Sequence, residues 1–236
     1  MDSLILQKAA DCNRKGADFC ATGNTQKGMQ YYRQALNILL NEVMIHDIEN
    51  HGVDPPSPAT KEGRLTRRSQ DGDPMCLHVH NPETLFMYET SILFTPKVDE
   101  RITHSTVALF LAVIEFNMAL AFHVRVVTKR GVDGIKKTKH LTNMAVALYD
   151  CCGQHVGHAL QCSEASTVLV AALKNKAQLM NQELVVGIQE MKGLLDTLGG
   201  ALVHCRQTPS IFSNEELEEF VLNVMVFPQL KFAAAA

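Results

Sequence analysis

The chain has 236 residues, of which 46% are hydrophobic and 20% charged, and it carries a formal net charge of −3. A globular protein of this size buries a core large enough to need neither disulfides nor a structural metal. The slightly negative charge argues against a dedicated nucleic-acid binder, and seven cysteines without a CxxC pair argue against a secreted disulfide scaffold and favour a cytoplasmic or nuclear location.

A helix, a tight turn and a second helix are predicted for the first 43 residues. In the first helix, apolar and small residues recur every three or four positions, at Ile5, Ala9, Cys12, Gly16 and Phe19. The sequence TGNT interrupts this run, and its Gly23 is suited to a turn with positive φ. The same periodicity then resumes in a second run, at Tyr32, Ala35, Leu36, Leu39 and Val43.

The next two segments differ from the helices in composition. Residues 51–74 are rich in proline, glycine and charge, which predicts a flexible loop. Residues 75–96 alternate in part between apolar and polar residues and contain the turn sequence NPE, which predicts a β-hairpin insertion. Because an isolated pair of strands is marginal in water, this hairpin should lie against the helices.

Residues 103–127 form the most apolar segment and predict one long helix. Glu115 and Asn117 interrupt its apolar run, so we expect a buried core helix and no membrane span. A basic, glycine-bearing loop is expected to follow, and a solvated loop is its ordinary interpretation, with an acidic partner segment as the alternative. The basic residues of this stretch are Arg125, Lys129, Arg130, Lys136, Lys137 and Lys139.

Four further helices complete the predicted fold. Helical periodicity returns over 139–152, 163–183 and 187–204, and a last helix follows, in which Ser213 and Glu216 fit a capping box. We therefore expect one all-α domain over residues 1–236, made of about seven helices in antiparallel pairs with a small β-hairpin insertion.

The residues of the first helix pair resemble the tetratricopeptide repeat (TPR), a helical pair of about 34 residues. The resemblance covers roughly residues 9–42. The early tryptophan-like position is Cys12, and the late proline is missing. The order small, aromatic, glycine, small, aromatic, alanine is carried by Gly16, Phe19, Gly23, Gly28, Tyr32 and Ala35.

Two weaker copies of this pattern follow at uneven spacing. Ala119 and Phe122 with Ala145, Tyr149 and Cys152 form one, and Ala177 with Met180 begins the other. The chain therefore resembles a degenerate TPR array. It is also loosely similar to uncharacterised TPR-like proteins of diatom-type algae, through Glu216, Phe220 and Asn223 in the last helix.

The resemblance implies a concave groove lined by the first helix of each pair, which holds an extended peptide. Asn117 and Asn175 stand two residues before the small position of their copies, and an asparagine there can offer a donor and an acceptor to a peptide backbone. Alternatively, both are ordinary polar helix residues. Asn13 is the third predicted groove residue. Asn13 and Ala17 occupy the places where chaperone-binding TPR domains have a lysine and an asparagine, so that carboxylate-gripping partner is not expected.

No catalytic or cofactor motif emerges from the remaining polar residues. Cys151, His155, His158 and Cys162 would share a helix face, but the outer two would be about 16 Å apart along the axis, too far for one zinc ion. Cys76, His78 and His80 have no second ligand pair nearby in sequence. We therefore expect that the protein binds no metal and no cofactor and is not an enzyme.

The function that the sequence predicts is protein–protein interaction, by a scaffold or adaptor that binds a peptide or partner segment. The alternative is a structural subunit of a larger assembly, whose apolar helices 103–127 and 215–227 are covered by neighbouring chains. A third hypothesis, a metal-dependent enzyme using Cys151, His155 and His158, is the least favoured of the three.

Overall fold

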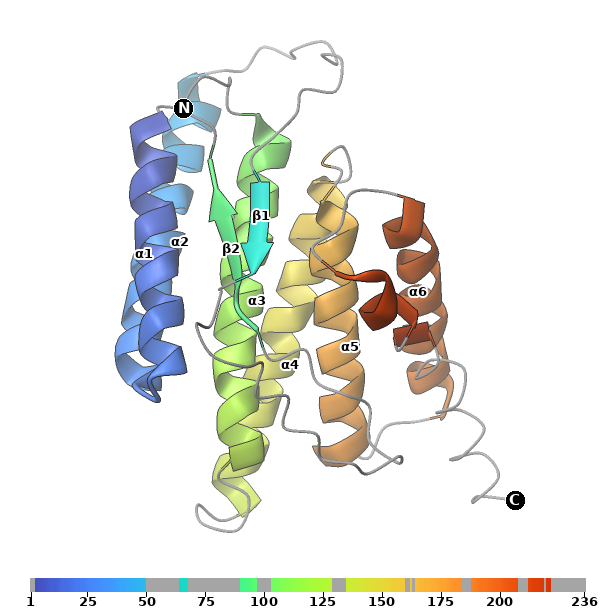
Figure 1. Ribbon diagram of the computed structural model, residues 1–236. Coiled ribbons are helices and arrows are strands. Elements are labelled where there is room, and N and C mark those ends of the chain that lie inside the picture. The colour runs from blue at the N-terminus through green and yellow to red at the C-terminus, as the bar shows by residue number, and fades with distance from the viewer. Residues whose placement is uncertain are drawn as a thin grey trace, which may run out of the picture.

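The computed structural model describes residues 3–49, 64–67, 90–96, 103–128, 135–159, 162, 164–183, 188–207, 212–218 and 220–221. In this part of the chain, six long helices and two short strands follow one another (Figure 1). The helices are α1 (Ser3–Ala21), α2 (Thr25–Glu49), α3 (His104–Thr128), α4 (Ile135–His158), α5 (Ala165–Glu183) and α6 (Ile188–Gln207). The strands are β1 (Arg64–Arg67) and β2 (Ile92–Thr95).

The helices pack in the order in which they occur in the chain. The pairs α1–α2, α3–α4 and α5–α6 each lie in contact, α2 packs on α3, and α4 packs on α5. The first helices of the pairs also meet, since α1 contacts α3 and α3 contacts α5. The predicted fold class is thereby confirmed: the protein is mostly helical, with antiparallel helix pairs and a small antiparallel sheet.

The crossing of α1 and α2 depends on two glycines. A Cβ atom at Gly16 would lie 2.5 Å from Cε1 of Tyr32, and one at Gly28 would lie 2.8 Å from the carbonyl oxygen of Gly16. Gly23 has a φ of 81°, as a turn that ends α1 requires. The predicted helix, turn and helix over the first 43 residues are therefore confirmed, and the small residues lie where the backbones approach most closely.

Replacing Gly28 with alanine should therefore destabilise the chain. The added methyl group has no space against the α1 backbone, so we expect a loss of about 1–3 kcal/mol in the free energy of unfolding. Gly193, exposed within α6, is the matched control, because a Cβ atom there meets nothing within 4 Å. Gly193→Ala should stabilise the chain by about 0.5–1 kcal/mol. Urea unfolding of both variants measures the two changes in the free energy of unfolding. Equal changes would contradict the close packing of α2 on α1 at Gly28.

Helix α3 is the centre of the core, as its apolar sequence predicted. Among the described residues, it is the one helix long and apolar enough to cross a membrane, and 94% of its most apolar window is buried inside the fold. Helices α2, α4 and α5 and strand β2 all pack on it. The chain's own elements therefore cover the apolar surface of α3.

The sheet is built differently from the predicted hairpin. Strand β2 lies within residues 75–96 as expected, but its antiparallel partner β1 lies within 51–74, where a flexible loop was predicted. That prediction was wrong for residues 64–67, because Leu65 provides one buried apolar side chain within a polar stretch, and composition averaged over the stretch hides it. The rest of 51–74, and 75–89, lie outside the described residues.

Two helix boundaries also differ from the prediction. Helix α4 begins at Ile135 and continues through Gly153 and Gly157 to His158, because neither glycine is in a position that requires a break. Of the predicted basic loop, Lys136, Lys137 and Lys139 therefore lie in α4 and Arg125 lies in the last turn of α3. Lys129 and Arg130 lie outside the described residues.

The predicted last helix is present over residues 214–218, and its capping box is confirmed. The backbone N–H of Ser213 donates to Glu216 Oε2 at 2.8 Å, and the backbone N–H of Glu216 donates to Ser213 Oγ at 3.2 Å. Phe220 packs edge-on against Phe212 and lies 3.4 Å below the buried ammonium group of Lys174 in α5. The contact between Phe220 and Lys174 holds the last described residues against α5 of the third helix pair.

Candidate functional site

Two of the three predicted site asparagines meet on neighbouring helices. Asn13 of α1 and Asn117 of α3 are both 1% exposed. The Asn117 side-chain N–H donates to Asn13 Oδ1 at 3.0 Å, across a sequence separation of 104 residues. Buried amides of this kind are retained where each of their polar atoms finds a partner.

Both asparagines bind the main chain of one residue in β2. The Ile92 N–H donates to Asn117 Oδ1 at 2.9 Å, and Asn117 Nδ2 donates back to the Ile92 carbonyl oxygen at 2.7 Å. Asn13 Nδ2 donates to the same carbonyl at 3.4 Å. The side chain of Asn117 therefore makes the donor–acceptor pair that a neighbouring strand would otherwise make.

The outer edge of β1 is held in a similar way. The Leu65 N–H donates to the carboxylate of Glu164 at 2.7 Å, and Glu164 stands directly before α5. Leu65 faces Phe94 and Arg67 faces Ile92 in the register of the sheet, so the groups bonded to Glu164 and Asn117 point away from the partner strand. We call β1 with β2 the ribbon, and Asn13, Asn117 and Glu164 the ribbon clamp.

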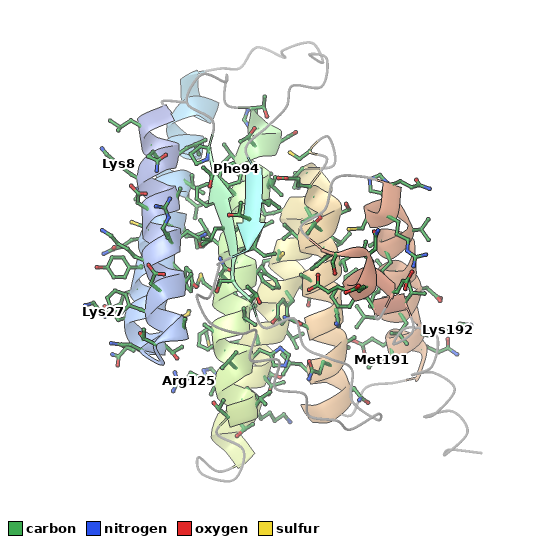
Figure 2. The ribbon with its side chains drawn as sticks, viewed as in Figure 1. Lys8, Lys27, Phe94, Arg125, Met191 and Lys192 are labelled. Atoms are coloured by element: carbon green, nitrogen blue, oxygen red, sulfur yellow. The ribbon has the colours of Figure 1, made fainter. Side chains whose placement is uncertain are left out.

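Alternate side chains of β2 are buried beneath the ribbon. Ile92 is 0% and Phe94 2% exposed, whereas Leu93 is half-buried and Thr95 exposed. The ring of Phe94, which is labelled in Figure 2, stacks on Phe110 of α3, with 4.6 Å between the ring centroids. Figure 1 shows the ribbon in front of α3, between the first helix pair and α5. The site therefore combines hydrogen bonds from the clamp to the main chain with the burial of two apolar side chains.

The third predicted asparagine lies elsewhere. Asn175 of α5 is fully buried and donates through Nδ2 to the hydroxyl of Tyr149 in α4 at 3.1 Å. The same hydroxyl lies 3.3 Å from Nδ1 of His123 in α3. Asn175 thus belongs to a polar network inside the core that connects α3, α4 and α5. Its hydrogen bond to Tyr149 does not involve the ribbon.

His123 was not identified from the sequence, although its pKa is strongly shifted in the folded chain. It is 0% exposed, and burial lowers its pKa to about 3. Among the described residues, no group hydrogen-bonds to its Nε2 atom. Burial also raises the pKa of Tyr149, so the pair is held in its neutral form.

The histidine and cysteine residues considered for zinc make other contacts. His155 Nδ1 donates to Glu115 Oε2 at 2.7 Å, which joins α4 to the buried carboxylate of α3. In the part of the chain that the structure describes, no three His, Cys, Asp or Glu side chains are grouped so as to hold a metal ion. Cys76, His78 and His80 lie outside that part.

The ion pair between His155 and Glu115 should make stability depend on pH. Its hydrogen bond raises the pKa of His155 above the ordinary 6.5, so its stabilising effect is complete below pH 6.5 and is lost as the pH rises through the raised value. His155→Gln retains a neutral donor but no charge. The melting temperature of wild type should therefore exceed that of the variant, and this difference should be larger at pH 6 than at pH 9. A constant difference would contradict the charged pair.

Three residues of the site were missed from the sequence. Ile92 and Phe94 carried a usable signal, since they alternate with more polar neighbours in a short β-prone run. Glu164 carried none, because it bonds to a residue 99 positions away. The side chains of Arg125 and Lys139, which the structure describes within the basic stretch, form no hydrogen bond or ion pair with the clamp residues.

Comparison with protein-family models, with curated proteins and with solved structures finds no match to this chain. The interpretation of the site therefore depends on its geometry.

Proposed function

We propose that this protein is a degenerate TPR-like scaffold that binds an extended segment of a partner protein on the face lined by α1, α3 and α5. Three helix pairs packed in sequence support this class, because such pairs in TPR proteins present their first helices to a ligand. The small residues assigned to the repeat pattern are buried, which the pattern requires. They are Gly16, Gly28, Ala119, Ala145 and Ala177.

The single observation that carries the proposal is the pair of hydrogen bonds between Asn117 and Ile92. An asparagine that donates to and accepts from one residue recognises an extended backbone whatever the side chains are. Asn13 orients this amide, because its Oδ1 accepts one of the Asn117 N–H groups. The face therefore has the chemistry for holding an extended segment.

A binding role is favoured over the role of a structural assembly subunit. That alternative required helix 103–127 to be covered by neighbouring chains, but α3 is covered by the chain's own helices and strand. We also propose a role without catalysis or cofactor, in the cytoplasm or nucleus. The six described cysteines are thiols and not disulfides, as those reducing compartments maintain them.

Selection from a library of random linear peptides tests this function. Peptides that bind the wild-type chain should be enriched, and their binding should weaken at least tenfold with Asn117→Ala. Asn143→Ala, an exposed change on α4, is the matched control and should leave binding unchanged. If nothing is enriched, or if the selected peptides bind the Asn117→Ala chain equally well while it keeps its helical circular dichroism, the proposal is wrong.

A further inference from the structure

The ribbon clamp forms hydrogen bonds with main-chain atoms, so these bonds do not depend on the side chains of the strand that it holds. Asn117 contacts Ile92 through the main-chain N–H and carbonyl, and Glu164 contacts Leu65 through the main-chain N–H. An extended segment in the place of β2 offers Asn117 the same N–H and carbonyl, whatever its side chains are. The clamp alone therefore favours the extended conformation, and the preference for a sequence depends on which side chains are buried beside it.

Burial at alternate positions of β2 favours large apolar side chains. Ile92 and Phe94 point to the same side of β2, where both are buried, and Phe94 is stacked on Phe110. Leu93 is only half-buried and Thr95 is exposed, so the intervening positions tolerate other residues. The pattern recognised is an aliphatic residue, any residue, then an aromatic residue.

The ribbon depends on the helices for its stability. A pair of four-residue strands is marginal in water by itself, so β2 retains its conformation through the clamp and through the burial of Ile92 and Phe94. Strand β2 is joined to α3 by eight residues of the same chain, so it occupies the site as an intramolecular ligand. A free segment of the same pattern therefore competes with β2 at a disadvantage that can be measured.

We propose that β2 is the chain's own occupant of a peptide site, and that an extended partner segment with an aliphatic residue followed two positions later by an aromatic residue replaces it. This inference rests on the proposed function and specifies its ligand. Residues 90–96, TSILFTP, are the internal example of the ligand. A partner segment binds by making the hydrogen bonds that Ile92 makes and by stacking its aromatic side chain on Phe110 in the place of Phe94.

The test uses a fluorescent peptide with the sequence of residues 89–97 and measures its binding by fluorescence polarisation. Phe94→Asp disables the internal strand but leaves the clamp intact, so this variant should bind the peptide at least tenfold more tightly than wild type. The same peptide N-methylated at its isoleucine lacks the N–H that Asn117 accepts and should bind at least tenfold more weakly. Phe94→Ala replaces Phe94→Asp if the latter loses its helical circular dichroism.

Three results would overturn the inference. The first is no binding to a folded Phe94 variant, and the second is equal binding of the N-methylated peptide. The third is a wild-type dimer that the peptide dissociates, which would make a second copy of the chain the occupant. If the β2 peptide fails while library peptides still bind in an Asn117-dependent way, the proposed function stands and this inference alone fails. If neither the β2 peptide nor any library peptide binds, the proposed function and this inference are both wrong.

Discussion

At pH 4, wild-type protein should be less stable than at pH 7 by about 3 kcal/mol through His123 alone. The side chain is fully buried and its pKa lies near 3 in the folded chain, whereas an unfolded histidine titrates near 6.5. The unfolded state therefore binds the proton first as the pH falls. The contribution of His123 is complete above pH 6.5 and is lost progressively as the pH falls towards 3.

The variant His123→Leu isolates this effect, since leucine has a similar volume and does not titrate. Urea unfolding at pH 7 and pH 4 should show a smaller loss of stability for the variant than for wild type, by about the 3 kcal/mol assigned to His123. His140→Leu, an exposed change on α4, serves as the control and should retain the wild-type difference. A variant as acid-sensitive as wild type would show that His123 is not buried in the neutral form.

Asn117→Ala should lower the free energy of unfolding by about 2–4 kcal/mol. The change leaves the N–H of Ile92 without its acceptor, weakens the bonding of the Ile92 carbonyl, and takes a donor from Asn13. Leaving buried polar groups unpaired costs more than the bonds themselves contribute. Urea unfolding at pH 7 measures the loss.

Asn143→Ala provides the reference for this prediction. Asn143 is exposed on α4, and surface substitutions of this kind change stability by less than about 0.5 kcal/mol. If Asn117→Ala and Asn143→Ala were equally stable, Asn117 would not hold β2 in solution, and the basis for a backbone-reading site would be removed.

The helix pairs could be predicted from the sequence because their signals are local. The three-to-four spacing that ends near Phe19, the break at Gly23 and the renewed spacing from Tyr32 all lie within a few residues of one another. The close approach at Gly16 and Gly28 follows from the same stretch, since both residues belong to one antiparallel crossing. Periodicity is a strong signal when the helices are long and neighbours in sequence pack together.

The clamp could not be predicted in full because its parts are far apart in the chain. The sequence identified Asn13 and Asn117 as candidate site residues, but not that they bond to each other or to Ile92. Asn175, chosen by the same spacing rule as Asn117, instead bonds to Tyr149 within the core. Position in the repeat pattern that the sequence predicts therefore indicates which helix a polar residue belongs to, and the neighbouring elements decide its partner.

Hydrogen exchange at the backbone amide of Ile92, followed by NMR in wild type and in Asn117→Ala, tests the central claim most directly. The amide should be protected in wild type, because its N–H donates to buried Asn117 Oδ1 at 2.9 Å. In the variant, this protection should fall at least tenfold relative to that of the α1 and α2 amides, beyond the general loss of stability. An Ile92 amide that exchanges as fast as an unstructured chain in wild type, or that is equally protected in both proteins, would contradict the account.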